Sequence, residues 1–214
     1  MIKKLIPFIV LFSLLFSLSC GDKKAANIRT NTSKSKTTAT PEIKTGVAPV
    51  ADNEIAVVEM QEPAYGTIKI ELYSNIAPKM VERFKTLAKE GFYNGTTFHR
   101  VSSMVLQGGD PLSKDDNPLN DGTGGSDKPD VPAEFSDVPY EPGIVGAART
   151  NDPNSANCQF YITMQRMPQW DRNYTVFGKV IEGMNNAKTI VGVPKDGERP
   201  LDAVRIKSIT IQPK

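Results

Sequence analysis

Short apolar segments with strand-like patterns recur along most of this 214-residue chain, and they limit its possible folds more than any other feature. In TIKIELY (67–73), apolar Ile68, Ile70 and Leu72 alternate with charged Lys69 and Glu71, which is typical of an antiparallel strand with one buried face. Seven further strands are predicted, at residues 55–60, 96–101, 104–109, 143–149, 158–164, 175–181 and 204–211. Because closure removes exposed edges, the sequence predicts a mainly β fold, a closed eight-stranded antiparallel β-barrel.

Two α-helices are expected to cap this barrel. Pro78 suits a first helical turn, and Gly91 suits the end of the same helix. Between them one apolar stripe has helical spacing, formed by Met80, Val81, Phe84, Leu87 and Ala88. A second, shorter helix fits residues 183–191. The intervening segment 110–142 is rich in Asp, Gly, Pro and Ser, and a loop of that length in a compact domain is usually functional.

The first residues, MIKKLIPFIVLFSLLFSLSC, indicate export. A short basic start is followed by an apolar run too short for a comfortable membrane span, which is typical of a signal peptide. The end of this run resembles a bacterial lipobox, although Ser17 stands where Leu is usual. We therefore expect a lipoprotein signal peptide at residues 1–19 and lipidation of Cys20. The simpler alternative is a plain cleaved signal in which Cys20 is incidental.

Residues 20–52 are predicted to be a flexible tether, with the folded domain at residues 53–214. The segment from Gly21 to Asp52 has almost no large apolar residue, so it cannot bury enough surface to offset its ordering entropy. About thirty such residues would reach roughly 30 Å. We expect a monomer in the bacterial cell envelope, held by its lipid anchor to the outer membrane and facing the periplasm, because Gly21 lacks the acidic character that marks inner-membrane retention. The cell surface and the inner membrane remain alternatives.

Charge and composition exclude several classes of function. Residues 51–214 contain 18 basic and 22 acidic side chains, which argues against a nucleic-acid partner. His99 is the only histidine, and one His with one available Cys makes a poor metal site. We therefore expect no metal and no cofactor. Cys158 is interpreted as a buried core thiol, with redox sensing as the alternative.

The stretch FHRVSSMVLQGGD (98–110) is the most distinctive. No obvious nucleophile lies near His99, so a packed structural histidine is the simpler interpretation. Arg100 could be an ordinary surface arginine, but Gln107 follows on the next predicted strand. Gln159 and Tyr161 share one face of another strand. An arginine, two glutamines and apolar groups would suit a shallow pocket for a neutral amide.

Four motifs then carry a family resemblance. The chain contains FHRV followed by QGGD, then GTGGS (122–126), ARTNDPNSANCQFYI (148–162) and YTVFGKVIEGM (174–184). Together, in this order, they resemble the bacterial branch of the cyclophilin peptidyl-prolyl isomerases, over roughly residues 55–212. The resemblance implies isomerisation of X–Pro peptide bonds, with proline-containing peptides and unfolded exported proteins as partners.

The resemblance also implies roles for individual residues. Arg100 would donate to the prolyl nitrogen in the twisted state, and Gln107 would place Arg100 and hold a substrate carbonyl. His99 would only support them. The residues implied to bind substrate are Phe98, Met104, Val105, Ala148, Arg149, Thr150, Gln159, Tyr161, Trp170, Tyr174 and Phe177.

Several positions depart from the family pattern. Six residues separate Arg100 from Gln107, one fewer than is usual, and we expect a shortened turn at Ser102–Ser103 because a slipped strand would turn Gln107 away. Met104 replaces an aromatic residue. Gln169 stands where Trp often contacts cyclosporin, and Tyr174 stands where His is common. We therefore expect weak inhibition by cyclosporin.

Three functions remain open on the sequence alone. The first is an envelope prolyl isomerase that assists the folding of exported proteins. The second is a proline-peptide binding module or chaperone with little turnover, which the Met104 replacement and the short turn would allow. A surface adhesin or solute-binding lipoprotein fits the leader but not the four motifs.

Overall fold

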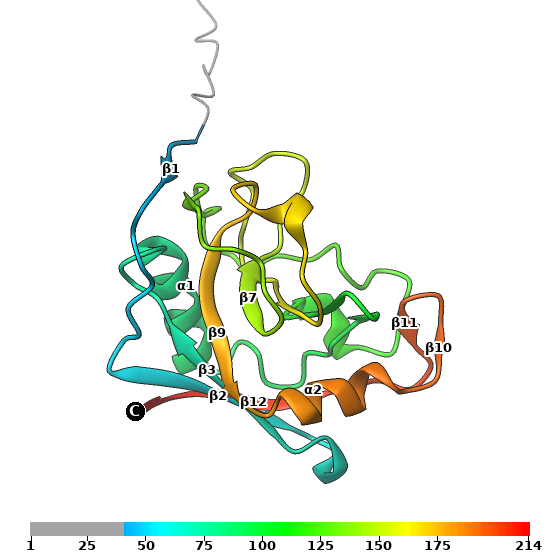
Figure 1. Ribbon diagram of the computed structural model, residues 1–214. Helices are drawn as coiled ribbons and strands as arrows, with labels where there is room; N and C mark the ends of the chain where they lie inside the picture. Colours follow the sequence, from blue (N-terminus) through cyan, green and yellow to red (C-terminus); the bar gives the residue numbers. More distant parts are fainter. Residues whose placement is uncertain (1–40) are drawn as a thin grey trace, which may run out of the picture. The chain divides into compact units, whose positions relative to one another are not determined.

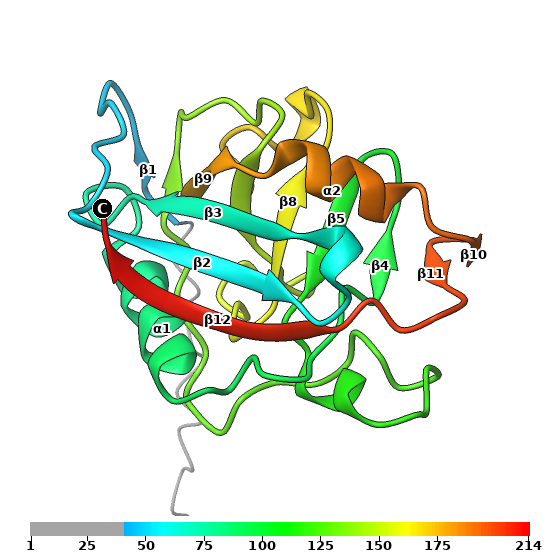
Figure 2. The same ribbon diagram turned by 90° about the horizontal axis from the view of Figure 1, so that it is seen from below.

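An eight-stranded antiparallel sheet dominates the computed structural model, which describes residues 41–214 (Figures 1 and 2). The strand order is β12-β2-β3-β9-β7-β8-β5-β4. The strands are β2 (Glu54–Met60), β3 (Thr67–Leu72), β4 (Arg100–Val101), β5 (Val105–Gly108), β7 (Ile144–Ala147), β8 (Phe160–Thr163), β9 (Val176–Glu182) and β12 (Ile206–Pro213). Each predicted strand segment overlaps one of these eight, so the mainly β class is confirmed.

The prediction of a closed barrel was wrong, because the sheet is an open half-barrel with β12 and β4 at its edges. Among residues 41–214, the only β-bridge between these edges is an isolated one between Thr97 and Arg205. Backbone hydrogen bonds join residues 96–98 to 204–206, but the amide of Val101 donates instead to Glu198. Residues 199–203 leave the sheet between these two contacts, so no continuous ladder forms.

The alternation in β3 has the predicted consequence. Ile68, Ile70 and Leu72 are fully buried, and β3 pairs with β2 and β9 on either side. Figure 2 shows β12, β2 and β3 side by side along one face of the domain. The main core lies behind them and includes Phe84, Phe160 and many aliphatic side chains.

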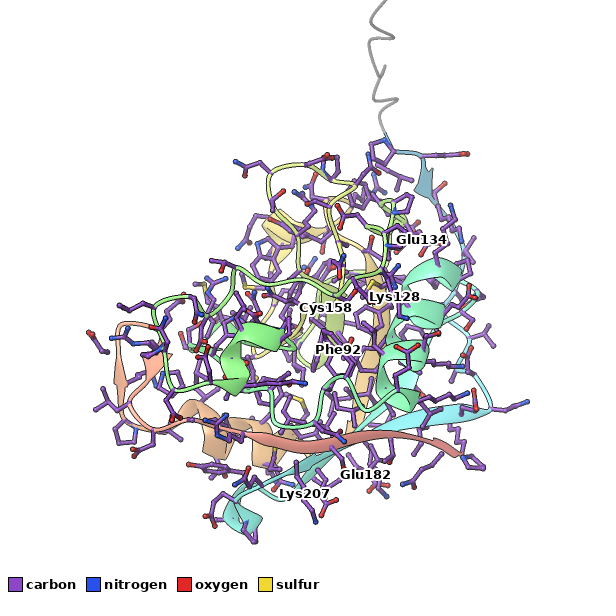
Figure 3. The ribbon with its side chains drawn as sticks, turned by 180° about the vertical axis from the view of Figure 1, so that it is seen from behind. Phe92, Lys128, Glu134, Cys158, Glu182 and Lys207 are labelled. Atoms are coloured by element: carbon purple, nitrogen blue, oxygen red, sulfur yellow. The ribbon has the colours of Figure 1, made fainter. Side chains whose placement is uncertain are left out.

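Helix α1 (Pro78–Lys89) is confirmed, and it buries the five residues of the predicted stripe. Its first-turn amides have an external acceptor, because Lys79 N and Met80 N donate to the Glu134 carboxylate at 3.2 and 3.0 Å. Figure 3 shows Glu134 beside this end of the helix. The negative charge of this carboxylate also stabilises the helix, because it lies at the positive end of the helix dipole. The helix packs against β12 and β9.

The remaining elements are short. Helix α2 (Met184–Val191) is confirmed and packs against β3 and the 3₁₀ turn η1 (Pro63–Tyr65). Two further 3₁₀ turns are η2 (Pro111–Lys114) and η3 (Pro168–Trp170). A small hairpin joins β10 (Lys195–Asp196) to β11 (Arg199–Pro200), and β1 (Ile43–Lys44) pairs in parallel with β6 (Phe135–Ser136). None of the helices among residues 41–214 has the length and apolar character needed to cross a membrane.

Residues 41–52 lie against the domain, so the predicted boundary of the tether was wrong for this part. The Lys44 amine donates to the Ile76 carbonyl at 2.7 Å, and Val50 N donates to the Asn75 side chain at 3.0 Å. Asp52 accepts from the Ser74 hydroxyl at 2.7 Å and pairs with Lys85 at 2.5 Å. These contacts are polar, and an apolar pattern in the sequence could not reveal them. The predicted signal peptide, the lipidated Cys20 and the rest of the tether lie outside the described residues.

Asp52→Ala should lower the free energy of unfolding by about 1–3 kcal/mol at pH 7, because a carboxylate with charged and hydroxyl partners is removed. Partial burial raises the pKa of Asp52, but hydrogen bonds from Lys85 and Ser74 outweigh it and keep the pKa below its ordinary value. A lowered pKa in the folded state stabilises the protein above the unfolded-state value of about 3.9. The difference from wild type should therefore shrink as the pH falls through the folded-state pKa.

Urea unfolding of the purified protein between pH 3 and pH 7 measures this difference. Asp202→Ala, in an exposed loop, is the charge-matched control and should change stability by less than about 0.5 kcal/mol. Equal stability of Asp52→Ala and wild type at pH 7 would show that the contacts of Asp52 do not stabilise the fold.

Candidate active site

Arg100 and Gln107 face each other across the hairpin of β4 and β5. They are register partners, as are Val101 and Leu106. The reverse turn lies between Ser102 and Val105, where Ser102 N donates to Val105 O at 2.9 Å. The missing residue has therefore shortened the turn and has not slipped the strand, as predicted. This register keeps the Arg100 and Gln107 side chains on one face of the sheet.

A chain of hydrogen bonds runs from Arg100 across three segments. Arg100 Nη1 lies 3.5 Å from Gln107 Oε1, and Gln107 Nε2 donates to Gln159 Oε1 at 3.1 Å. Gln159 Nε2 in turn donates to the carbonyls of Gly122 and Gly124, at 3.1 and 2.9 Å. The hydrogen bonds of this series fix the orientation of the Gln107 and Gln159 side-chain amides, because each amide oxygen accepts from one neighbour and each amide nitrogen donates to the next. The network fixes the Gln107 side chain beside the guanidinium.

The segment 110–124 is organised by Asp110, which the sequence analysis did not single out. Its fully buried carboxylate accepts from Leu112 N at 2.9 Å, from Gly124 N at 3.2 Å and from Gly122 N. A Cβ added at Gly124 would lie 2.2 Å from the Asp110 carboxylate, so only glycine allows this close approach. Asp110 thereby places the two carbonyls that accept from Gln159.

A second cluster of apolar and aromatic side chains lies beside this network. Six of the predicted substrate-binding residues belong to it. Val105 and Tyr161 are almost fully buried within the cluster, and Met104, Ala148, Trp170 and Tyr174 pack against it. The Tyr161 ring centroid lies 5.0 Å from that of Trp170 and 6.3 Å from that of Tyr174. The structure therefore brings this part of the prediction together next to Arg100.

Tyr161 is held from behind by residues that the sequence analysis missed. Its hydroxyl donates to that of Tyr140 at 3.1 Å, and its ring lies where a Cβ on Gly146 would be, at 2.5 Å. Burial raises the pKa of both tyrosines well above the ordinary value, so both hydroxyls stay protonated near neutral pH. No sequence pattern links Tyr140 to Tyr161, because the two lie on different segments.

The loop that carries Trp170 and Tyr174 is fixed by an ion pair. Arg166 donates to the Asp171 carboxylate through both terminal nitrogens, with Nη1 at 2.9 Å from Oδ1. Asp171 also accepts from the amide of Tyr140 at 2.9 Å. The hydrogen bonds from Arg166 hold the pKa of Asp171 below its ordinary value. The loop is therefore anchored to the segment that supports Tyr161.

Arg149 lines two cavities along this face. Its guanidinium lies 4.3 Å from the Tyr174 ring centroid and donates to the carbonyls of Thr150 and Asn173. One cavity, of about 370 Å³, is lined by Gln107, Gln159, Arg149 and Thr150 among others. The other, of about 470 Å³, is lined by Arg100, Gln107 and Arg149 among others. Arg100, with its side chain 40% exposed, thus borders open space.

Two predicted substrate-binding residues are placed elsewhere. Phe98 and Phe177 are fully buried in the main core, where Phe98 meets Phe160 edge to face and Phe177 meets Phe84. Neither lines these two cavities, although the family resemblance implied that both bind substrate. Packing in the main core accounts for the presence of both aromatic side chains, and a role in substrate binding is not needed.

His99 and Cys158 are also interior groups. The His99 ring is nine-tenths buried against Gly122, and burial lowers its pKa, so it stays neutral near pH 7. Cys158 is fully buried within the domain (Figure 3). Burial raises the pKa of its thiol to about 11, which favours the core-thiol interpretation over redox sensing.

This geometry suits a neutral, partly apolar ligand. A charged donor with a fixed amide partner borders a cavity beside an aromatic cluster, and the described residues that line this cavity include no serine, threonine or cysteine. Glu198, which the sequence analysis did not identify, contacts Arg100 Nε at 2.6 Å. Such a site can bind an apolar ring and direct a hydrogen bond at an adjacent amide.

Comparisons with known proteins point to one family. The family model described as "Cyclophilin type peptidyl-prolyl cis-trans isomerase/CLD" matches residues 56–211. A Brucella suis protein named probable peptidyl-prolyl cis-trans isomerase is 46% identical over 125 residues, which is 56% of this chain and 64% of the Brucella protein. A Schizosaccharomyces pombe peptidyl-prolyl cis-trans isomerase is 38% identical over 160 residues, which is 71% of this chain and 96% of that protein.

A solved structure leads to the same family. A Cryptosporidium parvum cyclophilin type peptidyl-prolyl cis-trans isomerase, in the presence of the dipeptide Ala-Pro, has a TM-score of 0.67 and 30% sequence identity. The match covers 75% of this chain and 99% of that one.

Proposed function

This chain belongs to the cyclophilin-type peptidyl-prolyl cis-trans isomerase family, and we propose that it catalyses rotation about X–Pro peptide bonds. The observation that carries this proposal is the position of Arg100. The β4–β5 register holds it opposite Gln107 at the edge of an open cavity and beside the aromatic cluster around Tyr161.

The chemistry needs one well-placed donor. Rotation about an X–Pro bond is slow because the C–N bond has partial double-bond character, with a barrier of about 18–20 kcal/mol. Twisting breaks the conjugation and leaves a lone pair on the prolyl nitrogen. A donor aimed at that nitrogen stabilises the twisted state more than the planar one, which is the condition for catalysis. Arg100 suits this role because a guanidinium stays charged and carries rigidly placed donors.

The neighbouring groups would bind the substrate. The proline ring would lie against Met104, Val105 and the Tyr161 ring, framed by Trp170 and Tyr174. Gln107 would donate to a substrate carbonyl through its amide, while its oxygen holds Arg100. The residue before proline would follow the backbone at 148–150 toward the cavity that Gln159 lines.

Arg100→Ala should lower kcat/KM for an Ala-Pro-Phe peptide by about 10²–10³, the loss typical of removing one donor that acts in the transition state. Cis-to-trans isomerisation measured with the full-length chain provides the readout. Lys207→Ala removes one positive charge on β12, away from the site, and should leave the rate unchanged.

Two results would contradict this proposal, the first for the enzyme activity and the second for the role of Arg100. If the wild type and Arg100→Ala both fold but catalyse equally poorly, the domain is a proline-peptide binding module with little turnover. If both are equally active, catalysis does not depend on this guanidinium.

We further propose that cyclosporin inhibits this protein weakly. Gln169 lies in η3, where a tryptophan often contacts the inhibitor in the family, and its side-chain amide faces the Met167 sulfur at 3.9 Å. Gln169→Trp should therefore lower the inhibition constant by about tenfold, because an aromatic side chain adds apolar contact area. Tight inhibition of the wild type would contradict the proposal, and Gln165→Trp serves as a control for an added indole.

For the location of the protein we propose lipid anchoring in the bacterial envelope, where the domain would assist exported proteins. The support is the sequence of residues 1–20 alone. Cys20→Ser should move the protein from the membrane fraction to the soluble periplasmic fraction and abolish incorporation of labelled palmitate. An unchanged membrane association in this variant would contradict the anchor.

A further inference from the structure

A small hairpin reaches the catalytic strand from the far end of the chain. The turn between β10 and β11 contains Glu198, and Figure 2 shows β11 beside β4. The Glu198 carbonyl accepts from the amide of Val101 at 2.7 Å. This backbone bond fixes Glu198 next to the residue that follows Arg100, although 98 positions separate the two side chains in the sequence.

The Glu198 carboxylate contacts one edge of the Arg100 guanidinium. Oε2 accepts from Arg100 Nε at 2.6 Å, and both side chains are 40% exposed. An ion pair at this exposure would contribute little to stability if both side chains were free to move. Here the backbone segments that carry Arg100 and Glu198 are already joined by the hydrogen bond from Val101 N to Glu198 O, so the ion pair costs little additional conformational entropy. Its geometric effect on Arg100 is therefore larger than its contribution to stability.

The two neighbours of Arg100 leave a defined set of donors unused. A guanidinium has five N–H groups in one plane. Nε donates to Glu198, and Nη1 lies beside Gln107 Oε1. Contacts at these two points fix the plane of the guanidinium and leave the other N–H groups for the cavity of about 470 Å³ that Arg100 lines.

We propose that Glu198 is a positioning residue, which holds the guanidinium of Arg100 in the plane required for catalysis while leaving its terminal nitrogens free for the substrate. The inference rests on the proposed isomerase function. It predicts that loss of Glu198 lowers kcat and leaves KM nearly unchanged, because the substrate pocket itself is intact. A misplacement of one catalytic group by about 1 Å can cost up to 10²-fold in rate.

The opposite role would be inhibitory, with the carboxylate withholding Arg100 from the substrate. Contact at Nε rather than at a terminal nitrogen argues against this role. The hydrogen bond from Arg100 also holds the pKa of Glu198 below its ordinary value, so the carboxylate is charged at neutral pH in the free protein. The two roles predict changes of opposite sign in kcat.

The test compares Glu198→Ala, Glu198→Gln, Arg100→Ala and wild type, each as the full-length chain with the Ala-Pro-Phe peptide. Asp196→Asn is the matched control, because it removes one acidic charge from the same hairpin. In the wild type Asp196 pairs with Arg199 and not with Arg100. Glu198→Ala should lower kcat about tenfold with KM within twofold. Glu198→Gln keeps an acceptor oxygen and should recover about a third of wild-type kcat, while Asp196→Asn should match wild type.

A spectroscopic readout separates positioning from general damage. The Nε–H resonance of Arg100 in ¹⁵N-labelled protein is assigned by its loss in Arg100→Ala. It should exchange slowly with water in wild type, shift in Glu198→Gln and disappear by fast exchange in Glu198→Ala. Unchanged or raised kcat in Glu198→Ala, with wild-type activity present, overturns this inference alone. A wild type no faster than Arg100→Ala overturns the isomerase function and this inference with it.

Discussion

The register of the β4–β5 hairpin is the constraint on which the rest of the site depends. The segment between Arg100 and Gln107 is one residue shorter than is usual in the family. The two residues are still cross-strand partners, because the turn at residues 102–105 is shorter and the strand has not slipped. A slip of one position would send Gln107 to the opposite face and break its bond to Gln159. Everything that then fixes Arg100 comes from elsewhere in the chain, through the segment 110–124 on one side and Glu198 on the other.

The aromatic cluster depends on a second set of distant supports. Tyr140, Gly146 and Asp171 place Tyr161 and the loop of Trp170, and residues 41–52 hold the segment that contains β6 just before Tyr140. The N-terminal segment thus forms part of the scaffold behind the site. In a lipid-anchored protein, the tether would therefore end before this segment and not at residue 52.

Periodic and local features were predictable from the sequence. The strand positions, the buried face of α1 and the choice of a short turn over a slipped strand all follow from patterns within a few residues. Contacts between distant segments were not predictable. Glu198 and Tyr140 carry no local signal, and the open edge of the sheet depends on where residues 199–203 diverge. Phe98 and Phe177 were assigned to substrate because an aromatic residue in a motif cannot be separated by sequence from one in the core.

The most direct test of this account separates binding from turnover. Exchange NMR of an Ala-Pro-Phe peptide gives, in one experiment, the affinity of the protein for the peptide and the rate of cis–trans exchange while bound. The account predicts that Arg100→Ala retains the wild-type affinity within about threefold and slows bound-state exchange by about 10². A variant that loses affinity while its bound-state exchange stays as fast as in wild type would contradict the central role of Arg100 in catalysis.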